Sequence, residues 1–237
     1  GSGLTYQWQV DEGSGFDDII DGGVYGGATT TNLSVTGVTY GMNGYKYRCV
    51  LNSLCSSNVI SDEAILNVNT LPSINSQPTA PIICEGNNAI IEIVASGTSI
   101  TYQWQVNEGS GFNDIIDGGV YSGANTNTLA ITAATFDMNG YEYQCVVSGT
   151  CTPNATSEVV ILTVNSAPSI SGQPIAASVC ESGNASFEVD ASGSGLIYQW
   201  QFRSGNGGLW YDLEENGGIY SGTTTEMLVL TGVTFDL

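Results

Sequence analysis

Histidine is absent from the 237-residue chain, and Lys and Arg together number only 3 against 23 Asp and Glu. Without histidine the chain cannot build a Ser-His-Asp or Cys-His catalytic arrangement or a His-ligated metal site. Its only cations are Lys46, Arg48 and Arg203, and the formal net charge is -20, so it has no basic footprint to neutralise phosphates. We therefore expect neither nucleic acids nor anionic membrane surfaces as partners.

Long apolar runs are also missing, because stretches such as residues 159–162 (Val-Val-Ile-Leu) are far too short to insert across a membrane. Charged residues are 11% of the chain, whereas 41% of residues are hydrophobic and many of these are β-branched or aromatic. That balance is unlike a disordered acidic tail and predicts a folded β-protein. Six cysteines without any other metal-ligand pattern indicate an oxidising setting outside the cytoplasm.

An internal repeat dominates the chain. The pentapeptide Tyr-Gln-Trp-Gln-Val starts at Tyr6 and at Tyr102, and it returns at Tyr198 with Phe in the last place, which is a step of 96 residues both times. Residues 5–69 align with residues 101–165 without a gap, and the third copy takes three extra residues near residues 203–208. A unit of this length can contain its own core, so we expect tandem domains.

Alternation with a period of two predicts the strands. Ala89, Ile91 and Ile93 occupy every second position of one stretch, and their counterparts in the third copy are also apolar. The positions between them are Ser, Glu and Asp in the third copy, so the apolar row is the expected inner face. Turn-forming Gly and Asn residues separate such stretches, and no segment has a convincing helical stripe. About seven short strands in some 95 residues predict an all-β fold made of tandem β-sandwiches.

Several motifs resemble an immunoglobulin-like domain. Residues 168–200 contain Pro-x-Ile-x-x-Gln-Pro, Val-Cys-Glu, an alternating strand, Ala-Ser-Gly and Tyr-Gln-Trp, as in strands A to C of that fold. Residues 139–145 (Asn-Gly-Tyr-x-Tyr-x-Cys) resemble its E–F corner and strand F. In detail the whole chain is similar to the immunoglobulin-like repeats of giant surface adhesins of gliding and environmental Bacteroidota, which the type IX system exports.

The resemblance implies a Greek-key sandwich in each copy, of which only the middle one is whole. We predict residues 1–69 to be the C-terminal part of a first repeat (strands C to G) and residues 70–166 to be a complete second repeat. Residues 167–237 are then the N-terminal part of a third repeat (strands A to E). No signal-peptide pattern opens the chain, and incomplete sandwiches would have unpaired edges, so we expect a longer natural array.

The resemblance also implies which residues form the core. The strand-C tryptophan packs at the centre, and a tyrosine two residues before the strand-F cysteine bonds through its hydroxyl to upstream backbone. The chain departs from the pattern at strand B, where Ile93 or Val189 replaces the usual cysteine. The expected core residues are Trp8, Trp104, Trp200, Tyr47 and Tyr143.

The disulfide candidates are Cys49, Cys55, Cys84, Cys145, Cys151 and Cys180. Each repeat has one cysteine before strand B, one in strand F and one in the F–G loop. In this fold Cys84 should lie well over ~7 Å from Cys145, which is beyond bridging distance. Two arrangements remain open: a local Cys145–Cys151 type of bridge, or a bridge from the A–B cysteine of one repeat to the F–G cysteine of the next.

Acidic residues follow the Gly-Ser-Gly turns, and the calcium candidates among them are Asp18, Asp21, Asp114 and Asp117. No Asp-x-Asp-x-Asp-Gly loop is present, and Asp and Asn also serve turns. Paired carboxylates could serve a glycosidase, but the repeat matches Asp17 with Asn113 and Asp21 with Asn216. We therefore predict no enzyme activity, no catalytic residues and no cofactor other than this calcium candidate.

Near-gapless repetition, short Pro-containing linkers and the missing catalytic residues favour a structural role. We expect a repeat segment of a long extracellular adhesin, stalk or filament on a bacterial cell surface. Its partners are the neighbouring repeats of the same chain, with lateral self-association or surface glycans as further candidates. The alternative is a glycan- or surface-binding module that acts by avidity. Trp210, Tyr211 and Tyr220 could stack on sugars, but we expect Trp210 and Tyr220 to pack like Phe112 and Tyr121.

Overall fold

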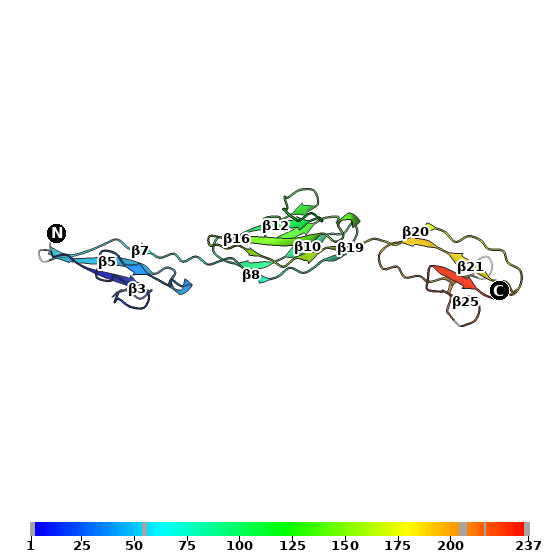
Figure 1. Ribbon diagram of the computed structural model, residues 1–237, viewed down its shortest axis with the longest axis horizontal. Helices are drawn as coiled ribbons and strands as arrows, with labels where there is room; N and C mark the ends of the chain where they lie inside the picture. Colours follow the sequence, from blue (N-terminus) through cyan, green and yellow to red (C-terminus); the bar gives the residue numbers. More distant parts are fainter. Residues whose placement is uncertain (1–2, 54–55, 204–207, 216, 235–237) are drawn as a thin grey trace. The chain divides into compact units, whose positions relative to one another are not determined.

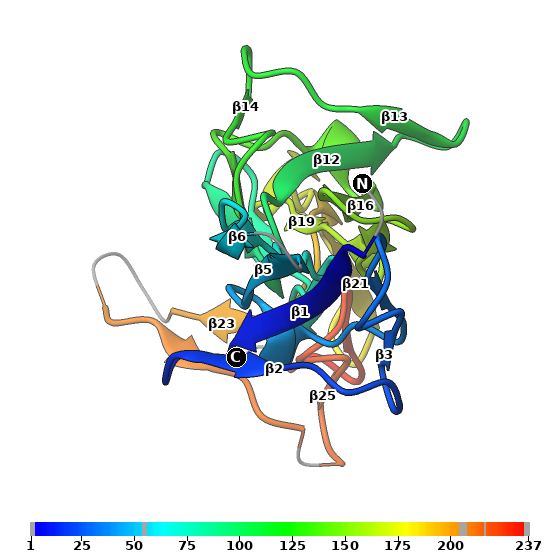
Figure 2. The ribbon, with the colours of Figure 1, turned by 90° about the vertical axis from the view of Figure 1, so that its left-hand side faces the viewer.

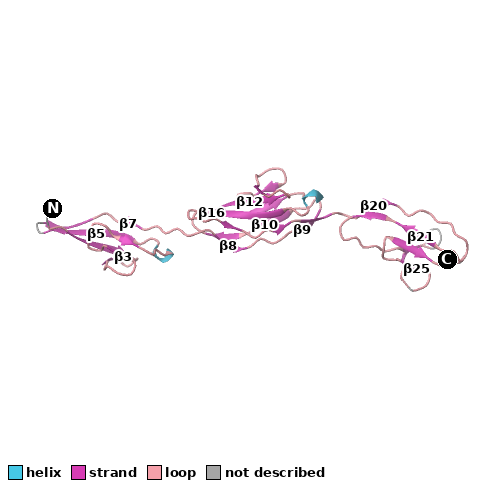
Figure 3. Cartoon of the chain, in the orientation of Figure 1, coloured by secondary structure: helices cyan, strands magenta, loops and turns pink. Residues whose placement is uncertain are grey.

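The computed structural model describes residues 3–53, 56–203, 208–215 and 217–234. Within these residues the chain consists of β-strands and turns, with two short 3₁₀ helices, η1 (Tyr40–Met42) and η2 (Phe136–Met138), and no α-helix (Figures 1 and 3). The all-β prediction is therefore confirmed. The chain divides into two compact units. The first comprises residues 1–77, 93–103 and 145–157, and the second comprises residues 78–92, 104–144 and 158–237.

The first unit contains the strands of the first sequence copy and some of the second. They are β1 (Thr5–Asp11), β2 (Phe16–Asp18), β3 (Tyr25–Gly26), β4 (Ser34–Val35), β5 (Lys46–Ser53), β6 (Ser56–Ile60), β7 (Ala64–Ile65), β8 (Ser73–Ser76), β11 (Val94–Ser96) and β17 (Ala155–Thr156). One antiparallel sheet has the order β2-β1-β5-β6, and β7 also pairs with β5. Figure 2 shows β2 returning beside β1. Two further pairs are β3 with β4 and β8 with β11.

The second unit contains most of the second copy and all of the third. Its strands are β9 (Ile82–Cys84), β10 (Ala89–Glu92), β13 (Phe112–Asp114), β14 (Tyr121–Ser122), β15 (Thr128–Ile131), β18 (Val160–Ile161), β19 (Thr163–Asn165), β20 (Ser169–Gly172), β21 (Ala185–Glu188), β22 (Asp190–Ser192), β23 (Gln201–Phe202), β24 (Tyr211–Asp212), β25 (Tyr220–Ser221) and β26 (Met227–Leu230). Strands β12 (Thr101–Asn107) and β16 (Glu142–Ser148) contribute residues to both units.

The middle copy has the two layers that a sandwich needs. One sheet has the order β13-β12-β16-β17, with β18 also beside β16, and the other has the order β10-β15-β14. Most pairs are antiparallel, but β19 runs parallel to β9, with Asn165 opposite Cys84 in the register. The third copy repeats the second sheet as β21-β26-β25.

The predicted inner row of the complete copy is confirmed. Ala89, Ile91 and Ile93 are 3%, 1% and 0% exposed, whereas Ile90 between them is 64% exposed. Strand β16 alternates in the same way, with Tyr143 buried on its inner side. Because successive side chains of a strand point to opposite faces, the period of two in the sequence is enough to orient these strands.

Burial of the expected core residues differs between the copies. Trp104 and Tyr143 are fully buried, and Tyr47 is 7% exposed. Trp8 and Trp200 are only half-buried, although Trp8 packs against the small core formed around Val10 and Tyr47. Among the described residues, the first copy has no strand that corresponds to β10 and the third has none that corresponds to β16, so less apolar surface covers their tryptophans.

The register of the third copy locates its extra residues. Gln201 pairs with Asp212, whereas Gln105 pairs with Asp114, so two of the extra residues lie in the β23–β24 hairpin. Tyr220 pairs with Leu230 as Tyr121 pairs with Ile131, which puts the third extra residue between β24 and β25. The expectation that all three lie near residues 203–208 was therefore wrong for one of them.

Candidate functional site

One turn holds the tryptophan in all three copies, and we call residues 27–32, 123–128 and 222–227 the tryptophan turns. The Trp104 indole N–H donates to the Thr126 carbonyl oxygen (3.0 Å), and the Trp104 backbone N–H donates to the Ala124 carbonyl oxygen (2.9 Å). The equivalent indole bonds are Trp8 to Thr30 (3.0 Å) and Trp200 to Thr225 (2.9 Å). Because an indole N–H that is removed from water needs an acceptor, each of these turns has the structural role of holding its tryptophan.

A carboxylate fixes each tryptophan turn. Asp21 Oδ1 accepts the Ala28 backbone N–H, and Asp117 Oδ1 accepts the Ala124 backbone N–H, both at 2.7 Å. In the third copy Glu215 takes this role: its Oε1 accepts the Thr223 backbone N–H, the counterpart of Ala124, at 3.3 Å, and the Gly222 backbone N–H at 2.8 Å. The match of Asp21 with Asn216 was therefore wrong. The third extra residue follows this position, so Asp21 corresponds to Glu215, one residue earlier than expected. Asn216 itself lies outside the described residues.

The other two calcium candidates stabilise a hairpin. The Gln9 side-chain N–H donates to Asp18 and that of Gln105 donates to Asp114, both at 2.8 Å. In the part of the chain that the structure describes, no three His, Cys, Asp or Glu side chains are grouped as metal ligands. The structure therefore places Asp18, Asp21, Asp114 and Asp117 in separate hydrogen bonds and does not bring three of them together.

Two tyrosine hydroxyls meet in each of the first two copies. Tyr143 Oη lies 3.1 Å from Tyr121 Oη, and Tyr47 Oη lies 3.4 Å from Tyr25 Oη. The expectation that the Tyr143 hydroxyl bonds to upstream backbone was wrong, because the hydroxyl is hydrogen-bonded to the side chain of Tyr121 from β14. Burial, followed by the bond to the partner tyrosine, raises the pKa of Tyr143 and of Tyr47 above the usual value for tyrosine.

These buried phenols predict an alkaline limit to stability. A raised pKa in the folded state means that each phenol contributes its full stabilisation below pH ~10, its pKa when unfolded, and loses it at higher pH. We expect the free energy of unfolding to fall by about 1.4 kcal/mol per pH unit for each such tyrosine above pH ~10. Urea unfolding between pH 8 and 12 measures the slope.

The matched variants are Tyr143→Phe and Tyr40→Phe. Tyr143→Phe should flatten the slope while costing about 1 kcal/mol at neutral pH, because the Tyr121 hydroxyl loses its partner. Tyr40 is 63% exposed, so Tyr40→Phe should leave the slope unchanged. Equal slopes in the two variants would contradict the assignment.

The cysteines differ sharply in exposure. Cys49, Cys84, Cys145, Cys151 and Cys180 are free thiols, and Cys55 lies outside the described residues. Cys49 and Cys145 are buried, Cys151 is half-buried, and Cys84 and Cys180 are exposed. Burial raises the pKa of the Cys145 thiol to about 11, so little reactive thiolate forms there at neutral pH.

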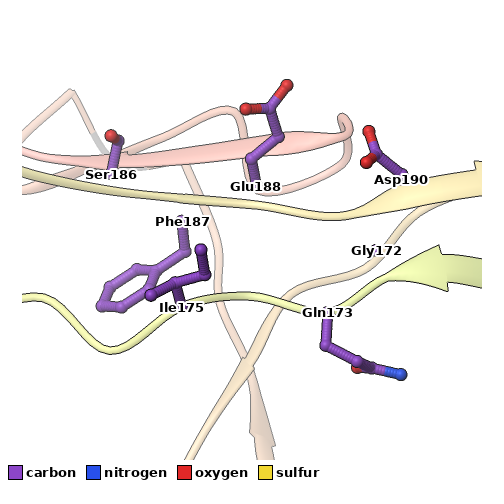
Figure 4. Close-up of a pocket in the computed structure, with 7 residues that line it drawn as sticks. All are labelled: Gly172, Gln173, Ile175, Ser186, Phe187, Glu188 and Asp190. Atoms are coloured by element: carbon purple, nitrogen blue, oxygen red, sulfur yellow. The ribbon is translucent and has the colours of Figure 1, made fainter.

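A hollow on the third copy lies between the start of that copy and strands β21 and β22 (Figure 4). Its volume is about 280 Å³. Glu188 and Asp190 point to one side of the strands, whereas Phe187 points to the other side beside Ile175 (Figure 4). This is the alternation of an ordinary half-buried strand, and no nucleophile and base face each other in the hollow.

In the third copy, two neighbouring aromatic residues at β24 are exposed. Trp210 is 58% exposed and Tyr211 is 55% exposed, whereas Tyr220 is half-buried. The expectation of packing was wrong for Trp210, because two extra residues lengthen its hairpin and the Arg203 guanidinium lies over the ring, 4.8 Å from its centre. In the first copy Arg48 lies over Phe16 in the same way, at 3.8 Å.

The linkers between copies are held from both sides. Before the first linker, the Val68 backbone N–H donates to the Asn43 side-chain oxygen (2.8 Å). Two residues later, the Thr70 backbone N–H donates to Thr98 Oγ1 (2.9 Å), and the Thr98 N–H returns to the Thr70 carbonyl oxygen (3.3 Å). Only Asn69 lies between the two attachments.

The second linker has the same contacts. The Val164 N–H donates to the Asn139 side chain (2.9 Å), and the Ser166 N–H donates to Ser194 Oγ (3.0 Å), with the Ser194 N–H returning to the Ser166 carbonyl (3.2 Å). We call the Thr70–Thr98 and Ser166–Ser194 contacts the hydroxyl clasps. The hydroxyl clasps were not predicted from the sequence, although the joint change from Thr-Thr to Ser-Ser is a signal that could have revealed them.

A glycine makes room for each linker. A Cβ atom on Gly97 would lie 3.0 Å from Pro72 Cα and 3.1 Å from the Leu71 carbonyl oxygen. Gly193 has the same spacing to Pro168 and Ala167. Because no side chain fits at these positions, the B–C turn lies directly against the linker.

No helix among the described residues combines the length and apolar character required to cross a membrane. A comparison of the sequence with protein-family models gives no match, and neither does a comparison with curated proteins.

Solved structures do resemble the chain. It is similar to the I-band fragment I67–I69 of titin, with a TM-score of 0.69 and 17% identity over 100% of this chain and 80% of that chain. An E-to-A mutated variant of the same three domains gives the same values. Immunoglobulin domains 1–5 of Sidekick-1 match 98% of this chain and 49% of that chain, with a TM-score of 0.52 and 15% identity. The chain therefore has the fold of tandem immunoglobulin-like β-sandwiches.

Proposed function

We propose that the chain is a structural segment of a long extracellular stalk or adhesin on a bacterial surface, built from repeats at residues 1–69, 70–166 and 167–237. The observation that carries this proposal is the pair of hydroxyl clasps. Each linker is hydrogen-bonded to the repeat before it and to the repeat after it. In the first linker a single residue, Asn69, separates the two attachments. In the second linker the equivalent residue, Asn165, is itself paired with β9. Repetition of one attachment at every junction suits a spacer that must hold its length.

Charge and composition support the location. The net charge of -20 keeps neighbouring chains apart and favours solubility at a surface. The carboxylates Asp21, Asp117 and Glu215 accept hydrogen bonds from backbone N–H groups of the tryptophan turns, so each of these three has a structural role. We accordingly propose a non-catalytic role.

The alternative, glycan binding by avidity, requires the same platform in each repeat. Trp210 and Tyr211 of the third copy are exposed aromatics, but their counterparts in the second copy are Phe112, which is half-buried, and Asn113. A platform in one repeat only does not multiply along an array, so the spacer role is better supported.

The stiffness of the junctions is the first test. Backbone ¹⁵N relaxation of the 237-residue chain should fit one rotational diffusion tensor for all three repeats. A chain with Gly-Ser-Gly-Ser-Gly-Ser inserted between Asn165 and Ser166 should instead show faster, independent tumbling of the third repeat. Independent tumbling of the repeats in the natural sequence would overturn the spacer proposal.

Point variants separate the clasp from general damage. Ser194→Ala removes the Oγ acceptor of the Ser166 N–H and should loosen the attachment of the third repeat, whereas Ser192→Ala, two residues away on an exposed site, should not.

The location has its own test: an antibody against residues 70–166 should label intact cells of the producing organism. Labelling only after permeabilisation would contradict a surface stalk.

A further inference from the structure

An open cavity of about 590 Å³ lies at the second linker, and Cys84 is part of its wall. Cys84 is exposed and ends β9, opposite Asn165, the last residue of β19. The same cavity is lined by Ser194 and Gly195 of the B–C turn of the third repeat, which the hydroxyl clasp attaches to Ser166. The A–B cysteine of one repeat therefore borders the same cavity as the B–C turn of the next.

The F–G cysteine lies at the same turn within its own repeat. In the second repeat the turn is Thr98 and Ser99, with Ser99 left-handed (φ 51°) as Gly195 is (φ 62°). The Thr150 backbone N–H donates to the Thr98 carbonyl oxygen (3.1 Å), so its neighbour Cys151 is held next to this turn. A Cβ atom on Gly149 would lie 3.0 Å from the same oxygen, which shows how closely the loop follows the turn.

Together these contacts bring two half-sites to one place. We propose that the A–B cysteine of each repeat (Cys84, Cys180) forms a disulfide with the F–G cysteine (the Cys151 type) of the following repeat, across the B–C turn that both of them border. The inference rests on the proposed extracellular array, because the partner of Cys84 would follow residue 237 and the partner of Cys151 would precede residue 1.

The buried cysteines fit the same scheme. Cys145 is 0% exposed on the inner side of β16, and its backbone N–H donates to Ser157 Oγ (2.9 Å). A local bridge to Cys151 would have to draw the Cys145 side chain out of the core or draw the loop away from Thr98. Cys49 and Cys145 are thus the free thiols of the array.

The bond forms by thiol–disulfide exchange with a disulfide oxidant, such as oxidised glutathione or a disulfide oxidoreductase. One thiolate attacks the oxidant and releases its first thiol, and the second thiolate then attacks the mixed disulfide and releases the second. The two cysteines lose two protons and two electrons, and the oxidant's disulfide is reduced to two thiols.

The first arm of the test uses the 237-residue chain in a glutathione redox buffer, so it does not depend on where the protein resides. Cys84 and Cys151 should react with iodoacetamide at least tenfold faster than Cys145, and no intramolecular link should form. A Cys145–Cys151 link in non-reducing peptide maps would overturn the proposal.

The second arm completes one pair. A second copy of residues 70–165 is inserted directly after Asn165, so that Cys84 of the first copy precedes Cys151 of the second. The expected peptide map links these two cysteines, and Cys84→Ser in the first copy should abolish the link while Cys145→Ser in either copy leaves it. Free thiols at both sites, in a chain whose circular dichroism matches that of the parent, would overturn the inference.

The two proposals can fail separately. A cross-repeat link together with independently tumbling repeats in the natural chain would reject the stiff spacer and keep the bridge. A single diffusion tensor without any link in the extended chain would keep the spacer and reject the bridge.

Discussion

Replacing Trp104 with Ala should unfold the second repeat, at a cost of about 3–5 kcal/mol. Trp104 is 0% exposed, so the change leaves a large cavity at the centre of the sandwich. It also removes the indole N–H that bonds the Thr126 carbonyl and so releases the tryptophan turn. Hydrogen exchange of peptides from residues 101–165, together with urea unfolding followed by circular dichroism, measures the loss.

The control is Trp210→Ala in the third repeat. Trp210 is 58% exposed, and the ring contact that the structure gives it is with Arg203, so we expect a cost within about 1 kcal/mol. If Trp104→Ala kept a cooperative, wild-type-like transition in the second repeat, the proposed core would be wrong.

Gly123→Ala should also destabilise the second repeat strongly. Gly123 has φ +82°, a left-handed conformation that costs Ala about 1–2 kcal/mol. Its new Cβ would also overlap the Thr128 carbonyl oxygen across the tryptophan turn, and such overpacking adds about 1–3 kcal/mol. We therefore expect a loss of roughly 2–5 kcal/mol in the free energy of unfolding.

Gly119→Ala separates the two causes. Gly119 is also left-handed (φ +60°), but a Cβ there would meet no atom within 4 Å, so the variant should lose only the backbone contribution of about 1–2 kcal/mol. Chemical denaturation of the two variants under the same conditions measures the difference. Equal losses would show that the turn moves aside for the methyl group.

The sequence predicted the fold well because its signals were local. The alternation of Ala89, Ile91 and Ile93 oriented a strand without knowledge of its partner, and the 96-residue step gave the repeats. A tandem array of β-sandwiches follows from these patterns, and the resemblance of the motifs at residues 139–145 and 168–200 made the expected sandwich immunoglobulin-like. The sequence could not predict how far Trp8 and Trp200 are covered, because burial depends on strands that pack over them from elsewhere.

The sites were predicted less well, because they depend on register. Glu215 aligns with Asp117 only if two of the extra residues lie in the β23–β24 hairpin and the third lies after it. The pairing of Gln201 with Asp212 is the observation that divides them in this way. The partner of the Tyr143 hydroxyl required the position of Tyr121, 22 residues away. The hydroxyl clasps join residues 28 positions apart, which single-sequence patterns do not relate.

The parallel pairing of β19 with β9 has a mechanical consequence. Tension applied to the two ends of the second repeat pulls β9 toward the N-terminus and β19 toward the C-terminus, along their common axis. Their hydrogen bonds, such as Thr163 N–H to Pro81 O (3.0 Å) and Glu85 N–H to Asn165 O (2.8 Å), then carry the load in shear and must break together. Antiparallel strands pulled apart from one end would instead unzip one bond at a time, so the β9–β19 pair of this repeat is arranged to resist stretching.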